Sequence, residues 1–120
     1  MCTDGSRESD IRNWYYEQGR SVPNQLEFVH INQVDIWQRD MGPIFLKDPN
    51  GNLAVAGFRQ NEWGYDPGGE SDYSRQSSEI PGLVGTHLGI TNFFQSNFFS
   101  EGGDRICDGQ GTLFLSLIHI

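Results

Sequence analysis

A tight turn between two β-prone runs is the feature that most constrains the fold of this chain. The segment Asp48-Pro-Asn-Gly-Asn52 joins proline and aspartate to an Asn-Gly pair, which is the residue chemistry that hairpin turns favour. Residues 44–47 before the turn and residues 53–58 after it are mostly apolar. Two such runs joined by so short a turn pair with each other in opposite directions, so we predict an antiparallel β-hairpin.

The segment before this hairpin predicts one helix and one strand. Residues 6–18 place Ile11, Trp14 and Tyr15 on one helical face, and Gly19 can end the helix. Residues 26–31 alternate between polar and apolar side chains, which is typical of a strand.

The segment after the hairpin predicts further mixed elements. We expect a long polar loop over residues 59–79, overlapped by a helix over residues 72–88 that is interrupted at Pro81. A strand over residues 90–94 and a second hairpin complete the order. The second hairpin pairs residues 104–107 with residues 112–115 across Asp108-Gly-Gln-Gly. This order favours an α/β domain with mixed strands over an all-helical or sandwich fold.

Two acidic segments carry the chemistry of the chain. Asp35-Ile-Trp-Gln-Arg-Asp40 holds two carboxylates, a guanidinium and an indole, and Gly42-Pro43 then turns the backbone. Glu101-Gly-Gly-Asp104 is the second segment, and Asp108-Gly-Gln-Gly-Thr112 follows it. Because buried charges need partners, we interpret both segments as loops that present acids to a cationic ligand.

Composition narrows the classes of partner. The 120 residues hold 8 Lys and Arg against 16 Asp and Glu, giving a net charge of −8. This charge disfavours a nucleic-acid surface and attraction to an anionic membrane. With no long apolar run and no signal peptide, we expect a cytoplasmic protein in which Cys2 and Cys107 are free thiols. We expect Cys107 to be a small buried residue of a strand, and no cysteine or histidine has zinc spacing.

The motif Asp35-x-Trp-x-Arg-Asp-x-Gly-Pro43 resembles the signature of the agmatine deiminase and bacterial-type peptidylarginine deiminase family. Asn61-x-Trp-Gly64, Glu101-Gly-Gly103 and Asp108-Gly-x-Gly-Thr112 follow in the order of that family, so the resemblance covers about two thirds of the chain. It implies a partial pentein, an α/β propeller of ββαβ modules, with roughly one to two modules present. It also implies hydrolysis of a guanidinium to a ureido group with release of ammonia, without a metal or organic cofactor.

The resemblance also implies roles for individual residues. Asp40 would pair with the guanidinium of the substrate, and Glu101 would orient that group or support a catalytic histidine. Trp37 would wall the pocket, while Gly102 and Gly103 would let the backbone pass close to the ligand. We therefore expect Asp40 and Glu101 to face one shared concavity.

Other residues of these motifs can have a functional role at the pocket or a purely structural role. Arg59, Asn61 and Trp63 are weaker candidates for the rim of the substrate pocket. Asp35 and Arg39 can form an ion pair across a turn without touching a ligand. Trp37 and Trp63 can equally be core aromatics.

The nucleophile and the acid/base of the resembled family have no counterpart in this sequence. That family uses a cysteine after a glycine-rich stretch and a His-x-Asp pair, and neither pattern occurs here. We therefore expect a fragment that is inactive alone, with residues 1–30, 31–114 and 115–120 as separate parts. The last part, Leu115-Ser-Leu-Ile-His-Ile120, resembles the translation of a sequencing-library adaptor, so we interpret it as a non-native tail. The alternative is a genuine strand.

The substrate and even the class of protein stay open at this point. The resemblance implies conversion of agmatine to N-carbamoylputrescine, or of peptide arginine to citrulline. A rival of another class is a noncatalytic β-rich carbohydrate-binding module, suggested by the Gly, Trp, Tyr and Phe content. The rival predicts a closed domain, whereas a partial deiminase predicts open strand edges and uncovered apolar surface.

Overall fold

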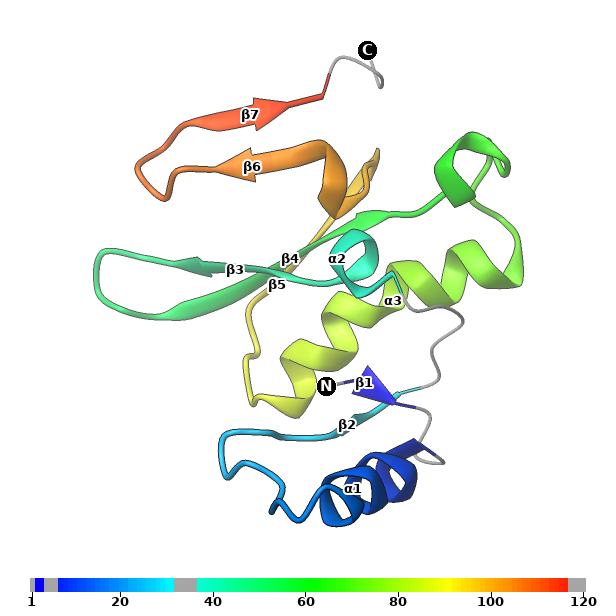
Figure 1. Cartoon of the computed structure of the whole chain (residues 1–120). Helices are drawn as coiled ribbons and strands as arrows, with labels where there is room; N and C mark the ends of the chain where they lie inside the picture. Colours follow the sequence, from blue (N-terminus) through cyan, green and yellow to red (C-terminus); the bar gives the residue numbers. More distant parts are fainter. Residues whose placement is uncertain (1, 4–6, 32–36, 117–120) are drawn as a thin grey trace. The chain divides into compact units, whose positions relative to one another are not determined.

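The computed structural model describes residues 2–3, 7–31 and 37–116, and the chain divides into two compact units, Met1–Gln33 and Val34–Ile120. The first unit contains β1 (Cys2–Thr3), α1 (Arg7–Glu17) and β2 (Val29–His30) (Figure 1). Helix α1 confirms the predicted helix, whose residue 6 lies outside the described residues. The strand predicted over residues 26–31 is shorter, because only Val29 and His30 pair with a neighbour, the parallel strand β1.

The second unit is built on a ββαβ module with the sheet order β3-β4-β5. Strands β3 and β4 are antiparallel, with Ile44 opposite Ala56, which confirms the first predicted hairpin. Strands β4 and β5 are parallel, with Val55 opposite Phe93, and the helix α3 crosses between them. The four elements are β3 (Ile44–Lys47), β4 (Leu53–Arg59), α3 (Asp72–His87) and β5 (Phe93–Phe99).

Helix α3 runs without a break through Pro81, so the predicted interruption is wrong. A Cβ atom on Gly57 of β4 would lie 2.9 Å from the Cβ atom of Pro81, so the glycine leaves room for the proline ring against the strand. Ile80 and Val84 are buried on the same helix, and Val55 is buried in β4. This packing outweighs the loss of the one backbone donor that proline lacks.

Other boundaries also differ from the predicted ones. Strand β5 (Phe93–Phe99) lies later than residues 90–94, because its parallel pairing with β4 begins only at Phe93. The loop expected over residues 59–79 contains the short 3₁₀ helix η1 (Glu62–Gly64) and gives way to α3 at Asp72. The first acidic segment was expected to be a loop, but its described part forms the short helix α2 (Gln38–Met41).

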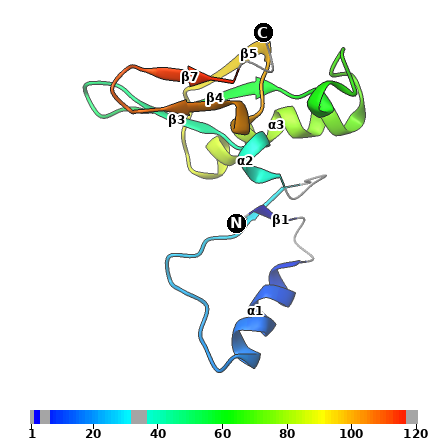
Figure 2. The same ribbon diagram turned by 45° about the horizontal axis from the view of Figure 1, so that its top comes forward.

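The second hairpin is confirmed and follows the short 3₁₀ helix η2 (Gly102–Asp104). Strands β6 (Arg105–Cys107) and β7 (Leu113–Leu115) pair with Arg105 opposite Leu115. Figure 2 shows this hairpin on the side of the sheet opposite α3. Leu115, placed in the predicted tail, belongs to β7, while residues 117–120 lie outside the described residues.

Much apolar surface of the second unit is exposed. Cys107 of β6 is exposed, so the prediction that it is buried is wrong. Except for Arg105, the residues of β6 and β7 are exposed. The described residues contain no helix with the length and hydropathy that a membrane span requires. The large exposed apolar side chains of β5, β6 and β7 are Phe93, Phe94, Phe98, Ile106, Leu113, Phe114 and Leu115.

Candidate active site

The two acidic segments meet where α2 contacts η2. The backbone N–H of Gly103 donates a hydrogen bond to Oδ1 of Asp40 over 3.2 Å. A Cβ atom on Gly102 would lie only 1.7 Å from the carbonyl oxygen of Arg39, so no larger residue fits there without moving one of the two segments. Gly102 therefore lets two pieces of backbone touch.

Local backbone geometry explains how α2 presents Asp40. The carbonyl of Trp37 accepts hydrogen bonds from the N–H groups of Asp40 and Met41, at 3.0 and 3.2 Å. Met41 is only 2% exposed and anchors the turn, while Asp40 is half-buried. Gly42 then leaves the helix in an extended conformation, and the chain passes through Pro43 into β3. The alternative that Asp35 and Arg39 form an ion pair involves Asp35, which lies outside the described residues.

Glu101 lies just after β5 and is the more deeply buried of the two predicted acids, with 3% of its surface exposed. Its backbone N–H donates to Oδ2 of Asp104 over 3.1 Å, which closes the η2 turn on itself. The end of the parallel strand β5 thus positions Glu101, and the turn that follows brings Gly103 to Asp40.

Arg105 supplies an internal cation beside these acids, and the sequence patterns gave no role to it. Its guanidinium donates to the carbonyl and hydroxyl oxygens of Ser100 at 2.9 and 2.6 Å and stacks over the Phe58 ring at 4.0 Å. The residue is 8% exposed, and burial lowers the pKa of its guanidinium from the ordinary value. The nearby carboxylates of Asp104, Glu101 and Asp40 oppose that lowering of the pKa, in this order of strength.

Gln60 is a second residue that sequence patterns missed. It is 5% exposed, and its side-chain Nε2 donates to the backbone carbonyls of Asp40 and Ser100 at 3.2 and 3.3 Å. A single glutamine after a strand carries no recognisable signal, because its partners are distant in the sequence.

Trp37, at the start of α2, belongs to an aromatic cluster. The rings of Trp37 and Trp63 meet edge to face with centroids 6.2 Å apart, and Trp63 lies 6.4 Å from Tyr73 of α3. Trp37 and Trp63 are 52% and 44% exposed, so neither is a core aromatic of the described chain. Tyr73 was not predicted.

The backbone that carries Trp63 is strained. Glu62 and Trp63 both take positive φ angles, of 54° and 53°, a region that bulky residues rarely adopt. The Asn61 side chain accepts a hydrogen bond from the N–H of Gly64 over 3.1 Å and holds this turn. In this structure the side-chain oxygen of Asn61 thus holds the turn that carries Trp63.

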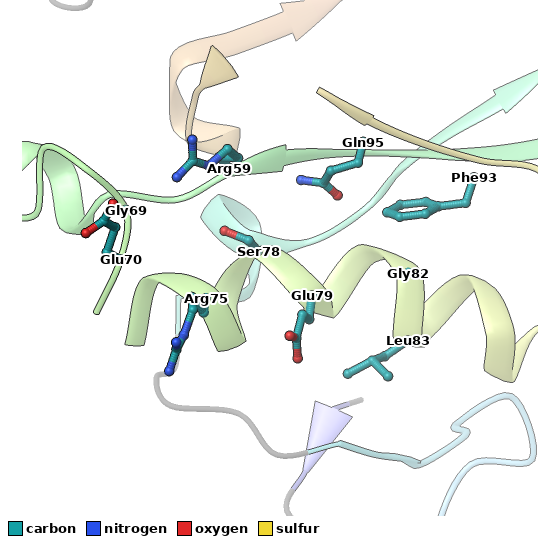
Figure 3. A pocket seen from close by; sticks show the side chains of 10 residues that line it. All are labelled: Arg59, Gly69, Glu70, Arg75, Ser78, Glu79, Gly82, Leu83, Phe93 and Gln95. Atoms are coloured by element: carbon teal, nitrogen blue, oxygen red, sulfur yellow. The ribbon is translucent and has the colours of Figure 1, made fainter. Parts of the chain in front are cut away.

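The side chain of Arg59 makes its contacts away from Asp40 and Glu101. It lines what we call the α3 groove, whose other lining residues include Glu70, Ser78, Leu83, Phe93 and Gln95. Its Nη2 donates to the Gly68 carbonyl over 2.6 Å, and its guanidinium lies 4.5 Å from the centroid of the Phe99 ring. The groove has a volume of about 860 Å³ and runs between β5 and α3, with Arg59 toward one end and Phe93 toward the other (Figure 3).

A smaller cavity of about 410 Å³ lies against the motif residues Arg39, Gly42 and Gly102. Arg105 and Cys107 also line it, and the rest of its wall is mostly apolar side chains of β3, β4 and β7. Among the described residues, no three His, Cys, Asp or Glu side chains gather in a way that could hold a metal ion.

The fold defines the structural class to which this chain belongs. The ββαβ module followed by a further hairpin is a part of the pentein architecture, and it matches solved agmatine deiminases. The Enterococcus faecalis enzyme matches 87% of this chain at 23% identity with a TM-score of 0.66, and this match spans 28% of that enzyme. A substrate-bound variant of C. jejuni agmatine deiminase matches 90% of the chain at 23% identity with a TM-score of 0.63, spanning 29% of that protein.

The sequence comparisons give the family. The model of the Porphyromonas-type peptidyl-arginine deiminases matches residues 1–117, and the chain belongs to this family. The agmatine deiminase of Pseudomonas fluorescens (strain SBW25) is 32% identical over 101 residues, which cover 82% of this chain and 27% of that protein. The chain therefore spans less than a third of the length of these relatives.

Proposed function

We propose that this chain supplies the acidic part of the active site of a longer enzyme that hydrolyses guanidino groups. One observation carries the proposal: the Gly103 N–H bonds the Asp40 carboxylate, so the segment of Glu101 adjoins the segment of Asp40. The membership of a deiminase family supports it.

The chemistry of these groups suits a guanidinium substrate. A guanidinium is a planar cation with a fork of N–H donors, and carboxylates arranged around its edge hold it best. In the proposed complex, Asp40 and Glu101 accept hydrogen bonds from the substrate and orient its central carbon for attack. Trp37 and Trp63 would bound the pocket and contact the cation or its alkyl stem.

The internal cation Arg105 fits this proposal on charge grounds. Three carboxylates lie near enough to Arg105 to act on its charge. Because they outnumber this one cation, the bound guanidinium of a substrate would bring the cluster closer to neutrality and would not give it an excess of positive charge. Arg105 would thereby keep the acids together when no substrate is bound.

The covalent chemistry would come from groups outside these 120 residues. A cysteine thiolate attacks the guanidinium carbon, a histidine protonates the departing ammonia, and water then hydrolyses the carbon–sulfur bond to give the ureido product. Carboxylates alone bind the cation but do not turn it over. The exposed apolar strands β5, β6 and β7 support a longer protein that covers them.

We propose agmatine as the substrate, with N-carbamoylputrescine and ammonia as products, a step toward putrescine and other polyamines. The relatives that are agmatine deiminases support this choice. A second candidate is the arginine side chain of a peptide, with a citrulline product, because the matching family model is that of peptidyl-arginine deiminases.

The test is turnover by the full-length protein encoded by the gene that contains this chain. The purified protein is incubated with agmatine and with a peptide ending in arginine, and ammonia and ureido product are measured. We expect equal amounts of both products from one of the two substrates. A folded full-length protein that turns over neither would contradict the proposal.

A further inference from the structure

We propose that Gln60 is a positioning residue that sets the separation between Asp40 and Glu101. The inference rests on the proposed function, since it concerns the same pair of acids. Its basis is the buried side-chain amide of Gln60, whose Nε2 donates to the carbonyl of Asp40 over 3.2 Å and to the carbonyl of Ser100 over 3.3 Å. Ser100 directly precedes Glu101, so one nitrogen joins the backbone at both acids.

We call the two hydrogen bonds of the Gln60 amide the Gln60 clamp, and the backbone of Gln60 is itself bonded to helix α3. The backbone N–H of Gln60 donates to Oγ of Ser78 over 2.9 Å, and that hydroxyl donates to the carbonyl of Ser74 over 2.6 Å. Both serines belong to α3, and Ser74 is fully buried. The side-chain amide therefore reaches the two acidic segments from a backbone position that directly follows β4 and is bonded to α3.

The chemistry of the contacts calls for glutamine. Two carbonyl oxygens from different segments need two N–H donors, and a primary amide carries both donors on one uncharged nitrogen. Asparagine is one methylene shorter, and glutamate would set a carboxylate against two carbonyl oxygens. A lysine or arginine would bring a charge into a site that is 5% exposed.

The hydrogen bonds around Ser100 indicate that Gln60 can position the acids without being essential for folding. The carbonyl of Ser100 accepts a second hydrogen bond, from Nη1 of Arg105, so it keeps a partner when the Gln60 amide is removed. The fold should then survive while the two segments lose the link that sets their spacing. A misplacement of about 1 Å in a site of this kind can reduce the rate about a hundredfold.

The experiment compares Gln60→Met with Gln95→Met in the full-length protein. Methionine keeps the length of glutamine but has no N–H donor, and Gln95 is an exposed glutamine of β5 that serves as the matched control. Three quantities are measured: kcat and KM on the substrate that the parent enzyme turns over, the melting temperature, and the amide exchange rate of Gly103 by NMR.

For Gln60→Met we expect kcat/KM to fall about a hundredfold, mainly through kcat, while the melting temperature shifts by only a few degrees. The Gly103 amide should exchange faster, because its bond to Asp40 depends on the spacing of the segments. Gln95→Met should match the parent protein in all three measurements. An active parent with Gln60→Met within about threefold of it in kcat/KM would overturn the inference.

The amide exchange rate keeps the two proposals distinguishable. If the parent protein turns over neither substrate, the proposed function fails, and the Gly103 exchange rate alone decides the role of Gln60. Faster exchange in Gln60→Met than in Gln95→Met would then support a clamp between the segments. Equal exchange rates would refute it.

Discussion

The N–H of Gly103 donates a hydrogen bond to the carboxylate of Asp40 across 63 positions of the chain. This bond links the helix α2, which opens the ββαβ module, to the turn η2, which follows its last strand. The two segments with family motifs are therefore brought together by the module itself. Gly102, Gln60 and Arg105 surround this contact and offer ways to test it.

Replacing Gly102 with alanine should open the contact between the two segments. The new Cβ atom would meet the Arg39 carbonyl oxygen at 1.7 Å, so backbone must move. We expect a loss of about 1–3 kcal/mol in the free energy of unfolding of the 120-residue chain, measured by urea titration. Gly103→Ala is the control, because its Cβ atom would approach only the Asp40 carboxylate, at 3.2 Å. A Gly102→Ala variant as stable as Gly103→Ala would show that the segments do not touch as described.

Replacing Arg105 with methionine should destabilise the second unit. The change removes a buried cation from among three carboxylates and leaves their mutual repulsion uncompensated. We expect a loss of about 3 kcal/mol in the free energy of unfolding. Arg75→Met removes an exposed cation that pairs with Asp72 on α3 and should lose less than about 1 kcal/mol. Equal losses in the two variants would refute a special role for Arg105.

Acid should weaken the connection between η1 and α3. Oδ2 of Asp66 accepts the N–H of Ser71 over 2.9 Å, and this bond is the main reason that the pKa of Asp66 lies below its ordinary value of 3.8. A lowered pKa in the folded chain means that Asp66 stabilises the fold above that ordinary value. The contribution is lost as the pH falls through the lowered pKa.

The measurement for Asp66 is the free energy of unfolding from about pH 6 to about pH 2, for the parent chain and for Asp66→Asn. The variant cannot take up a proton at this position, so its stability should fall less steeply on the acid side. Parallel curves for the two chains would show that Asp66 does not contribute.

The 120-residue chain alone should release neither ammonia nor ureido product from agmatine. It has no His-x-Asp pair, and its described thiol, Cys107, is a free exposed cysteine of β6. The assay compares the chain with buffer and with a Cys107→Ser variant. Turnover that disappears in Cys107→Ser would identify Cys107 as a nucleophile and contradict our view that the nucleophile lies elsewhere.

Local chemistry explains which elements could be predicted. Turn residues at 48–52 and 108–111 predicted both hairpins, and β3 has the predicted bounds. Pro81 was misjudged because the space for its ring comes from Gly57, on a different element. Strand β5 was placed too early because apolar character begins at Ile90, whereas parallel pairing with β4 begins at Phe93.

The candidate site could be predicted only where motifs mark it. Asp40, Glu101 and Trp37 could be named as candidates because they stand in recognisable motifs, and the segments of Asp40 and Glu101 are in contact in the structure. Gln60 contacts Asp40, Arg105 contacts Phe58, and Tyr73 contacts Trp63. No local sequence pattern reveals these contacts, because the partners are separated along the chain. Such roles need the tertiary structure.

The most direct test of the proposed site is the substitution Asp40→Asn in the full-length protein. Asparagine keeps the size of the side chain but removes its charge and turns one acceptor into a donor that faces the donors of the guanidinium. We expect a loss of about 3–5 kcal/mol in transition-state stabilisation, or roughly a hundredfold to several thousandfold in kcat/KM on agmatine or on peptide arginine. The melting curve should change little, because Met41 and Gly42-Pro43 hold the turn. A variant that folds normally and loses less than about fivefold in kcat/KM would show that Asp40 does not hold the substrate.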